Sequence, residues 1–228
     1  MFSRKPAAEW LDDNLGTPDE VQSALRSLRF VNRWFGGNRL HRILLEAIAE
    51  RTGTPEISVL EVAAGHAEVL KAAALVLNER GVTVQATLLD RQSSHLPTSW
   101  PAGLPKPEVL AGDALALPLA DKSMDVVSCC LFLHHLDVEQ AIQFLREATR
   151  VARVAVLVND LERTRLHYLL ARLFALVDPS RLSRHDGPVS VRQAHSRAEL
   201  QAMAAQTGRP FSLRRRFLYR HALLIWCD

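Results

Sequence analysis

The stretch "ISVLEVAAGHAEVLKAAALVL", residues Ile57–Leu77, decides the fold. Its first part, Ile57–Val62, has the continuous apolar character of a buried strand, and the Ala- and Leu-rich part from Glu68 onward favours a helix. A turn of small residues joins the two, with Glu61 at its entrance and Gly65 in its middle. A strand, a small-residue turn and a helix are typical of α/β proteins that bind a nucleotide-type cofactor.

The composition is that of an ordinary globular protein. The chain has 228 residues, 48% of them hydrophobic and 23% charged, which suits one domain with a sizeable core. The net charge of +3 is too small to require a nucleic-acid or membrane partner. The three cysteines form no CxxC pair, so we predict no metal site and a reducing, cytoplasmic location. No apolar run approaches the roughly 20 residues that span a bilayer, and the first residues lack a signal-peptide core.

Two helices are expected before the first strand. Thr17 is a suitable N-cap with Pro18 at the first helical position, and we expect Gly36 and Gly37 to end this helix. A second helix follows and closes at Gly53. We interpret residues 1–54 as an N-terminal helical cap and residues 55–228 as the main domain.

From Ile57 the pattern alternates between strands and helices. Helical patterns cover Glu68–Glu79 and Val138–Val151, and "LERTRLHYLLARLFALV" and "SRAELQAMAAQTG" predict two more helices. The expected strands are Ile57–Val62, Val82–Leu89, Glu108–Leu110, Asp125–Cys130, Val154–Asn159, Phe211–Phe217 and Tyr219–Trp226. The first five lack polar alternation, which indicates a parallel sheet covered on both faces. The last two are joined so tightly that they must be antiparallel. We therefore predict an α/β fold, a doubly wound sheet with an antiparallel C-terminal hairpin.

Acidic residues stand near the ends of three expected strands. Glu61, Asp90 and Asp113 follow this pattern, and ligands of such sheets bind where the carboxyl ends of the strands meet. Asp90 can accept hydrogen bonds from two ribose hydroxyls, Asp113 can accept one from an adenine amine, and Glu61 favours an ammonium group. The helix N-terminus after Gly65 offers N–H groups to a carboxylate. These residues predict a ligand with adenosine at one end and an amino acid at the other.

The run "VLEVAAGHA … LLD … AGDALALPLADKSMDVVSCCLFLHHL" resembles class I S-adenosylmethionine (SAM)-dependent methyltransferases. Within this family it is most similar to the small-molecule branch that includes the ubiquinone/menaquinone methyltransferases. The resemblance covers roughly residues 57–159 and implies a Rossmann-like, seven-stranded sheet with SAM as the cofactor. It assigns cofactor binding to Glu61, Ala63, Gly65, Asp90, Arg91, Asp113, Ala114, Cys130 and Leu131. In related enzymes an N-terminal helix folds over the cofactor, which adds Arg33 and Trp34, unless Trp34 instead anchors its helix on the core.

The first turn departs from the family pattern at two positions. Ala63 and Ala67 stand where the family normally has glycine. An alanine is tolerated there if its backbone stays at negative φ, but not where φ is positive. The middle glycine, Gly65, is kept, and SAM has no pyrophosphate beside the turn. We therefore expect a working site.

A phenol or enol acceptor must lose a proton on methylation, which calls for a base. The candidates are His134 and His135 after the fourth strand, His185 with Asp186, and Asp160 after the fifth strand. Residues 161–195 are longer than a simple crossover, and we expect a long loop there to act as a substrate lid. The alternatives are that the histidines cap turns, that His185 and Asp186 form a turn before Gly187, and that Asp160 caps the next helix.

We predict a methyltransferase acting at oxygen or carbon of a small, aromatic or polyketide-like acceptor. A nucleic-acid methyltransferase is the second hypothesis, although the fourth strand lacks the Asp/Asn-Pro-Pro-aromatic run of base-amine methylation. A non-catalytic or weak SAM-binding module is the third, because of the two alanines. The sequence is compatible with a homodimer.

Overall fold

The computed structural model describes residues 3–13, 15–216 and 218–228. Its elements follow one another as α1 (Pro18–Trp34), α2 (Gly37–Thr52), β1 (Glu56–Val62), α3 (Glu68–Glu79), β2 (Thr83–Asp90), η1 (Ser93–His95), β3 (Glu108–Ala111), β4 (Met124–Cys130), η2 (Leu133–His135), α4 (Val138–Val151), β5 (Ala152–Leu161), α5 (Arg165–Ala175), α6 (Arg181–Gln193), α7 (Arg197–Ala205), β6 (Phe211–Arg216) and β7 (Arg220–Trp226). The expected strands and helices are present, with ends that differ by a few residues at most.

The sheet has seven strands in the order β3-β2-β1-β4-β5-β7-β6. Strands β1 to β5 pair in parallel, and β7 lies antiparallel between β5 and β6. This topology confirms the doubly wound sheet with a reversed C-terminal hairpin. Phe217, which we expected to end the first hairpin strand, lies outside the described residues.

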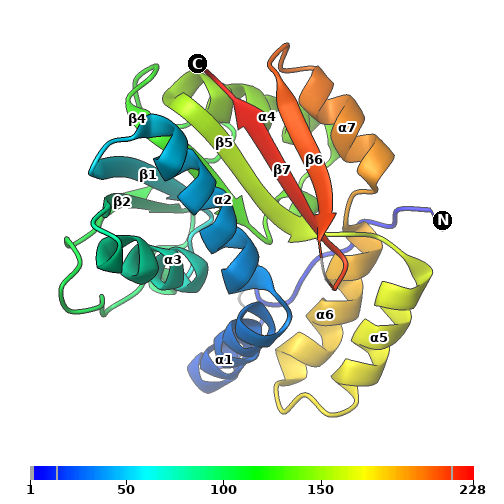
Figure 1. The fold of residues 1–228 in the computed structure, drawn as a ribbon. Coiled ribbons are helices and arrows are strands. Elements are labelled where there is room, and N and C mark those ends of the chain that lie inside the picture. Colours follow the sequence, from blue (N-terminus) through cyan, green and yellow to red (C-terminus); the bar gives the residue numbers. More distant parts are fainter. Residues whose placement is uncertain (1–2, 14, 217) are drawn as a thin grey trace.

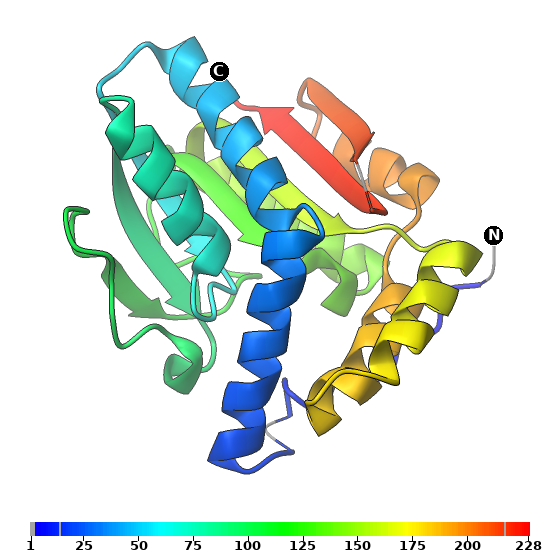
Figure 2. The same cartoon turned by 60° about the horizontal axis from the view of Figure 1, so that its bottom comes forward.

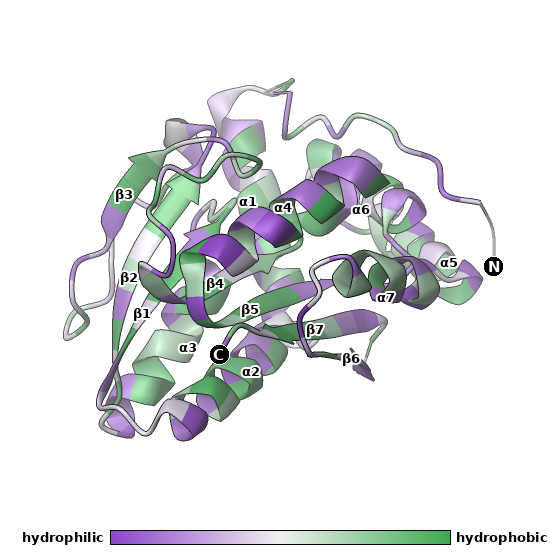
Figure 3. Cartoon of the chain, turned by 90° about the horizontal axis from the view of Figure 1, so that it is seen from above, coloured by the Kyte–Doolittle hydropathy of each residue, from purple (hydrophilic) through white to green (hydrophobic). Residues whose placement is uncertain are grey.

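Helices cover both faces of the sheet, as the continuous apolar strands require. Figure 3 shows α2 and α3 on one side of the sheet and α4 and α7 on the other. Leu45 and Ile48 of α2 share a buried cluster with Val59 of β1, so α2 belongs to the main core. Phe144 of α4 and Leu200 of α7 belong to the cluster on the opposite face. The division at residue 54 stays a prediction.

The junction between α1 and α2 differs from our expectation. Phe35 is the C-cap of α1, and Gly36, with φ of +81°, is the N-cap of α2. Gly37 is therefore the first residue of α2 and does not end α1. The capping box of Thr17 and Glu20 at the start of α1 is as the sequence indicates.

The segment after β5 contains the expected helix as α5, and a second helix, α6, replaces the loop that we expected after it. Helices α5 and α6 form a hairpin that lies with α1 beyond the carboxyl ends of the parallel strands (Figures 1 and 2). His185, Asp186 and Gly187 lie inside α6, so they do not form a turn. A role of this hairpin as a lid stays a prediction. In the described part of the chain, no helix is long and apolar enough to cross a membrane.

Candidate functional site

One cavity of about 1090 Å³ opens at the carboxyl edge of the parallel strands. The ends of β1, β2 and β4, the loop after β3 and helices α1, α5 and α6 line it. Most of the residues that the sequence singled out contribute to this lining: Glu61, Ala63, Gly65, Asp90, Arg91, Asp113, Ala114, Cys130, Leu131, His134 and His135. The cavity therefore joins the expected cofactor residues to the two histidines.

Asp90 ties the first turn to the tip of the second strand. Its Oδ2 accepts a hydrogen bond of 2.9 Å from the Gly65 N–H, and its Oδ1 accepts one of 2.9 Å from the Gln92 N–H. Each carboxylate oxygen keeps a second lone pair, which is what two ribose hydroxyls require. A Cβ built on Gly65 would meet nothing within 4 Å, so this turn borders open space. The donor and acceptor set fits an adenosine-bearing cofactor.

The two alanines of the turn adopt a glycine-like backbone. Ala63 has φ of +52° and Ala67 has φ of +53°. Our condition for tolerating alanine, a negative φ, is therefore not met at either position. A left-handed backbone costs a non-glycine residue about 1–2 kcal/mol. The turn keeps the shape of a glycine turn at the expense of local strain.

Glu61 places a buried carboxylate against the cavity. It pairs in register with Ser128 of β4, whose hydroxyl donates a hydrogen bond to it. Its Oε2 lies 3.5 Å from the Nε2 of His41, a residue of α2. In the next loop, Asp113 Oδ1 accepts a hydrogen bond of 2.9 Å from the Leu115 N–H. Glu61 is thus held by residues of β4 and α2, and Asp113 by the backbone of its own loop.

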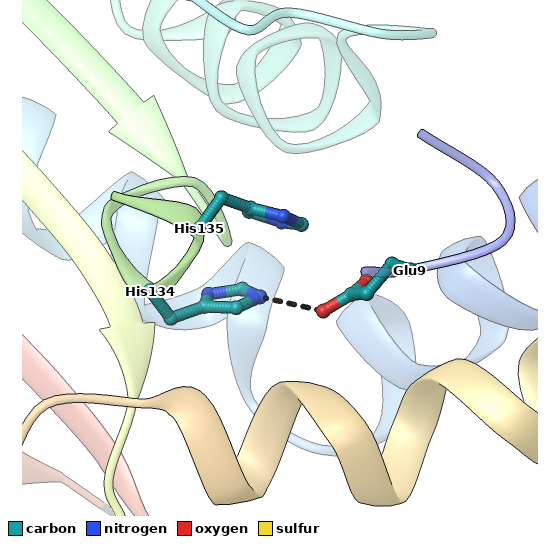
Figure 4. A group of neighbouring side chains, drawn as sticks. All are labelled: Glu9, His134 and His135. Carbon is teal, nitrogen blue, oxygen red and sulfur yellow. Dashed lines mark ion pairs between the residues drawn. The ribbon is translucent and has the colours of Figure 1, made fainter. Parts of the chain in front are cut away.

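His134 forms ion pairs with the carboxylates of Asp160 and Glu9. Figure 4 shows the pair with Glu9. The Nδ1 of His134 is 2.6 Å from Asp160 Oδ1, and its Nε2 is 3.5 Å from Glu9 Oε1. Burial alone would lower the pKa of His134, but Asp160 and Glu9 outweigh it and raise the pKa to about 10. Burial likewise opposes the charge of Asp160, whereas His134 lowers its pKa to about 2. At neutral pH this group holds an imidazolium and two carboxylates.

Asp160 does not cap the following helix, α5. Its Oδ2 accepts from the backbone N–H of His134, and its Oδ1 also accepts from the backbone N–H of Leu161. The N-cap of α5 is Thr164, whose side chain accepts from the His167 N–H. The alternative interpretation of Asp160 is therefore wrong. Asp160 does not line the cavity and acts on it through His134.

His135 forms a second carboxylate–imidazole pair. Its Nδ1 lies 2.7 Å from Asp12 Oδ2, and its ring centroid lies 4.2 Å from that of His134. Ligand atoms of Glu9, His134 and His135 lie within 4.8 Å of one another, a spacing that could hold a metal ion, although the sequence predicted none. The carboxylates around the imidazolium of His134 already balance its charge. We therefore interpret the group as an ion-paired proton site.

Glu9 and Asp12 belong to the segment before α1, which sequence reasoning did not single out. Helix α6 fixes this segment: Ser190 Oγ and Gln193 Nε2 each donate a hydrogen bond of 2.6 Å to Glu9 Oε1. Asp186 accepts hydrogen bonds from the backbone N–H groups of Trp10 and Leu11. The only signal in the sequence is the acidic run "EWLDD".

His185 has a positioning role and lies outside the cavity lining. Its ring stacks on Trp10 with centroids 3.9 Å apart, and its Nδ1 lies 2.8 Å from Asp186 Oδ1. The side chains of these two sequence neighbours therefore face each other. The structure therefore places His185 among the contacts that hold the N-terminal segment.

The N-terminal helix presents different residues from those expected. Arg33 and Trp34 do not line the cavity, and Trp34 is 64% exposed. Asn32 and Phe35 of the same turn line it instead. The difference arises because neighbouring positions on a helix point about 100° apart. Trp34 is therefore neither a pocket residue nor a core anchor.

A buried polar network of Arg220, Asn32 and Asn159 beside β4 was not predicted from the sequence. Arg220 is 1% exposed and donates hydrogen bonds to Asn32 Oδ1 at 2.8 Å and to Asn159 Oδ1 at 3.1 Å. Asn159 Nδ2 donates to the Gly37 carbonyl at 3.0 Å. The network joins the reversed strand β7 to α1 and α2 at the cavity wall. Its sequence signal, an Arg at the start of a hairpin strand, resembles solvated edge charge.

Residues 60–156 match a family model described as a methyltransferase domain. This part of the chain has the sequence of a methyltransferase domain. Within it, the resemblance to the ubiquinone/menaquinone branch stays a prediction. No curated protein sequence matches the chain.

Solved structures share the fold of the chain at low sequence identity. A SAM-dependent methyltransferase from Aquifex aeolicus is 17% identical with a TM-score of 0.58, over 87% of this chain and 97% of its own. Magnesium protoporphyrin IX methyltransferase from Synechocystis PCC 6803, with bound SAH, is 16% identical with a TM-score of 0.56, over 87% of this chain and 88% of its own. The CMeT domain of the citrinin polyketide synthase is 11% identical with a TM-score of 0.53, over 76% of this chain and 47% of that one.

Proposed function

We propose that this methyltransferase transfers the methyl group of SAM to an oxygen or carbon of a small, apolar acceptor of aromatic or polyketide-like chemistry. One observation carries the proposal. A single cavity joins strand-tip carboxylates, a pair of carboxylate-bound histidines and an apolar wall. The neighbours that act on a porphyrin and within a polyketide synthase are consistent with this acceptor class.

In this proposal Asp90 and Asp113 bind the adenosine part of SAM, and Glu61 binds the amino-acid part. Asp90 presents both carboxylate oxygens beside the open turn, where ribose hydroxyls can donate to them. Glu61 is 2% exposed, so its charge faces a poorly hydrated space in which an ammonium group is favoured. When bound, SAM supplies an electrophilic methyl group.

The other side of the cavity is apolar. Leu25 and Phe35 of α1, Leu170 and Phe174 of α5, and Val191 of α6 line it. Such a wall excludes water and favours a flat or aliphatic acceptor. Methyl transfer is an in-line displacement, so this positioning and desolvation supply much of the catalysis.

The two histidines divide the proton chemistry between them. Asp12 holds the Nδ1 side of His135, which leaves the Nε2 side to accept a proton from an acceptor hydroxyl. His134 is held as an imidazolium by Asp160 and Glu9, and its charge stabilises the oxyanion that forms beside it. We therefore assign His135 as the general base and His134 as an electrostatic stabiliser.

A methyl-transfer assay with SAM and a panel of phenols, enols and β-diketones tests the proposal, with O- and C-methyl products separated by mass spectrometry. We expect His135→Asn to lower kcat by about a hundredfold or more and to leave SAM affinity unchanged. Asp19→Asn is the control, because Asp19 is exposed on α1 and lies outside both ion pairs and the cavity lining. SAM binding without turnover of any acceptor in the panel would contradict the acceptor class. Failure to bind SAM would contradict the site itself.

A further inference from the structure

Helix α5 is apolar on its outer side, and none of its residues is buried. Leu166, Leu169 and Leu173 are 53%, 52% and 52% exposed. Leu176 and Val177, directly after the helix, are 79% and 76% exposed. Exposed leucines in such a row are unusual, because a helix in contact with water normally turns polar residues outward.

The helical repeat separates two apolar sides of α5. At about 100° per residue, Leu166, Leu169, Leu173 and Leu176 fall within one outer stripe. Leu170, Ala171 and Phe174 fall on the adjoining side and line the cavity. The helix is thus both a wall of the cavity and an apolar outer surface.

The end of α1 extends this outer surface. Phe30 is 47% exposed and its ring lies 6.2 Å from that of Phe174, centroid to centroid. Trp34 is 64% exposed, and its ring lies 6.4 Å from that of Phe30. Figure 2 shows α1 and α5 on the side of the molecule away from the sheet. We name this surface the apolar rim, formed by Phe30, Trp34, Leu166, Leu169, Leu173 and Leu176.

Positive charge surrounds the apolar rim. Residues 21–45 and 163–177 contain no Asp or Glu. Arg26, Arg33, Arg165 and Arg172 in these segments are exposed. On α5, Arg165 and Arg172 are seven residues apart and flank the leucine stripe on the same side. Leucine and aromatic side chains bordered by arginines, without acidic residues, are the pattern of a surface that lies on an anionic bilayer.

We propose that the apolar rim binds the surface of an anionic lipid membrane, with α5 lying in the headgroup region and its outer leucines in the acyl boundary. The arginines contact lipid phosphates, and Trp34 lies at the level where amphipathic aromatic rings collect. Because the same helix walls the cavity, an apolar acceptor dissolved in the bilayer reaches the site without crossing bulk water. This last step rests on the proposed function, whereas membrane binding does not.

The test is co-sedimentation of the full chain with vesicles of phosphatidylcholine alone and with vesicles that also contain phosphatidylglycerol. We expect binding to the anionic vesicles that weakens with added salt, as arginine–phosphate contacts require. Leu169→Gln with Leu173→Gln should weaken this binding by about tenfold or more. Leu75→Gln with Val109→Gln is the matched control, because these exposed apolar residues lie on α3 and β3.

Several outcomes would overturn the proposal. One is the absence of vesicle binding, and another is equal weakening by the rim and control variants. A third is a dimer in light scattering that the rim variant dissociates while vesicle binding is absent; the rim would then contact a second copy of the chain. All readouts are independent of methyl transfer, so they separate this proposal from the catalytic one. SAM affinity, measured in parallel, shows that the variants fold.

Discussion

Replacing Ala63 by glycine is expected to stabilise the protein. Ala63 has φ of +52°, and relief of the left-handed strain contributes about 1–2 kcal/mol to the free energy of unfolding. The greater conformational freedom of glycine in the unfolded chain lowers the free energy of unfolding by about 0.4–1 kcal/mol. Ala63 is only half-buried, so the loss of its methyl group adds little. The net expectation for Ala63→Gly is a gain of about 0.5–1 kcal/mol.

Ala67→Gly is the matched comparison within the same turn. Its φ is +53°, so the strain relieved is the same, but Ala67 is only 2% exposed. Loss of its buried methyl group costs about 0.8 kcal/mol, which brings the net change close to zero. Urea unfolding followed by circular dichroism measures the free energy of unfolding of both variants. In a thermal melt of a chain of this length, Ala63→Gly should raise Tm by about 1–4 °C. A destabilised Ala63→Gly variant, or equal gains at both positions, would refute the reasoning.

Three further expectations concern the site and its supports. Asp90→Ala should weaken SAM binding, measured by calorimetry, by at least about tenfold, because it removes the ribose acceptor; unchanged affinity would remove the assignment. The His134–Asp160 pair raises the pKa of His134 to about 10 and lowers that of Asp160 to about 2, from ordinary values of 6.5 and 3.8. Its stabilisation is therefore present in full between pH 3.8 and 6.5, is lost as pH rises from 6.5 toward about 10, and is also lost as pH falls from 3.8 toward about 2. Urea unfolding at pH 6 and pH 9 should show this loss, and Asp160→Asn should reduce it; an equal loss in both proteins would exclude the pair as its source. Gly37→Ala should destabilise the fold by about 2 kcal/mol or more, since a Cβ there would lie 2.4 Å from Asn32 Oδ1 and 3.0 Å from Asn32 Cα; a thermal melt like that of wild type would contradict this.

The central sheet could be predicted from the sequence because its signals are local. Buried parallel strands are continuous apolar runs, and Glu61, Asp90 and Asp113 follow from their place at strand ends. All three residues line the cavity. Their contacts with SAM stay predictions.

The other half of the site depends on contacts between distant parts of the chain. Glu9 and Asp12 lie in a segment without helix or strand, and contacts with α6 and η2 hold them. Helical periodicity could not distinguish Trp34 from Phe35 as the residue that faces the cavity. The positive φ of Ala63 is contrary to the conformational preference of alanine, because tertiary contacts of the turn outweigh the local strain energy.

The N-terminal segment contributes to the histidine half of the site and not to the cofactor half around Asp90. It brings both carboxylates that face the histidines from the cavity side, yet it contributes no strand or helix to the core. Loss of its contacts with α6 would leave the sheet, Asp90 and the first turn in place. The positions of the two histidines can therefore change while the cofactor half stays intact. A tag or other group attached to the first residues can then lower the turnover of a preparation that still binds SAM fully.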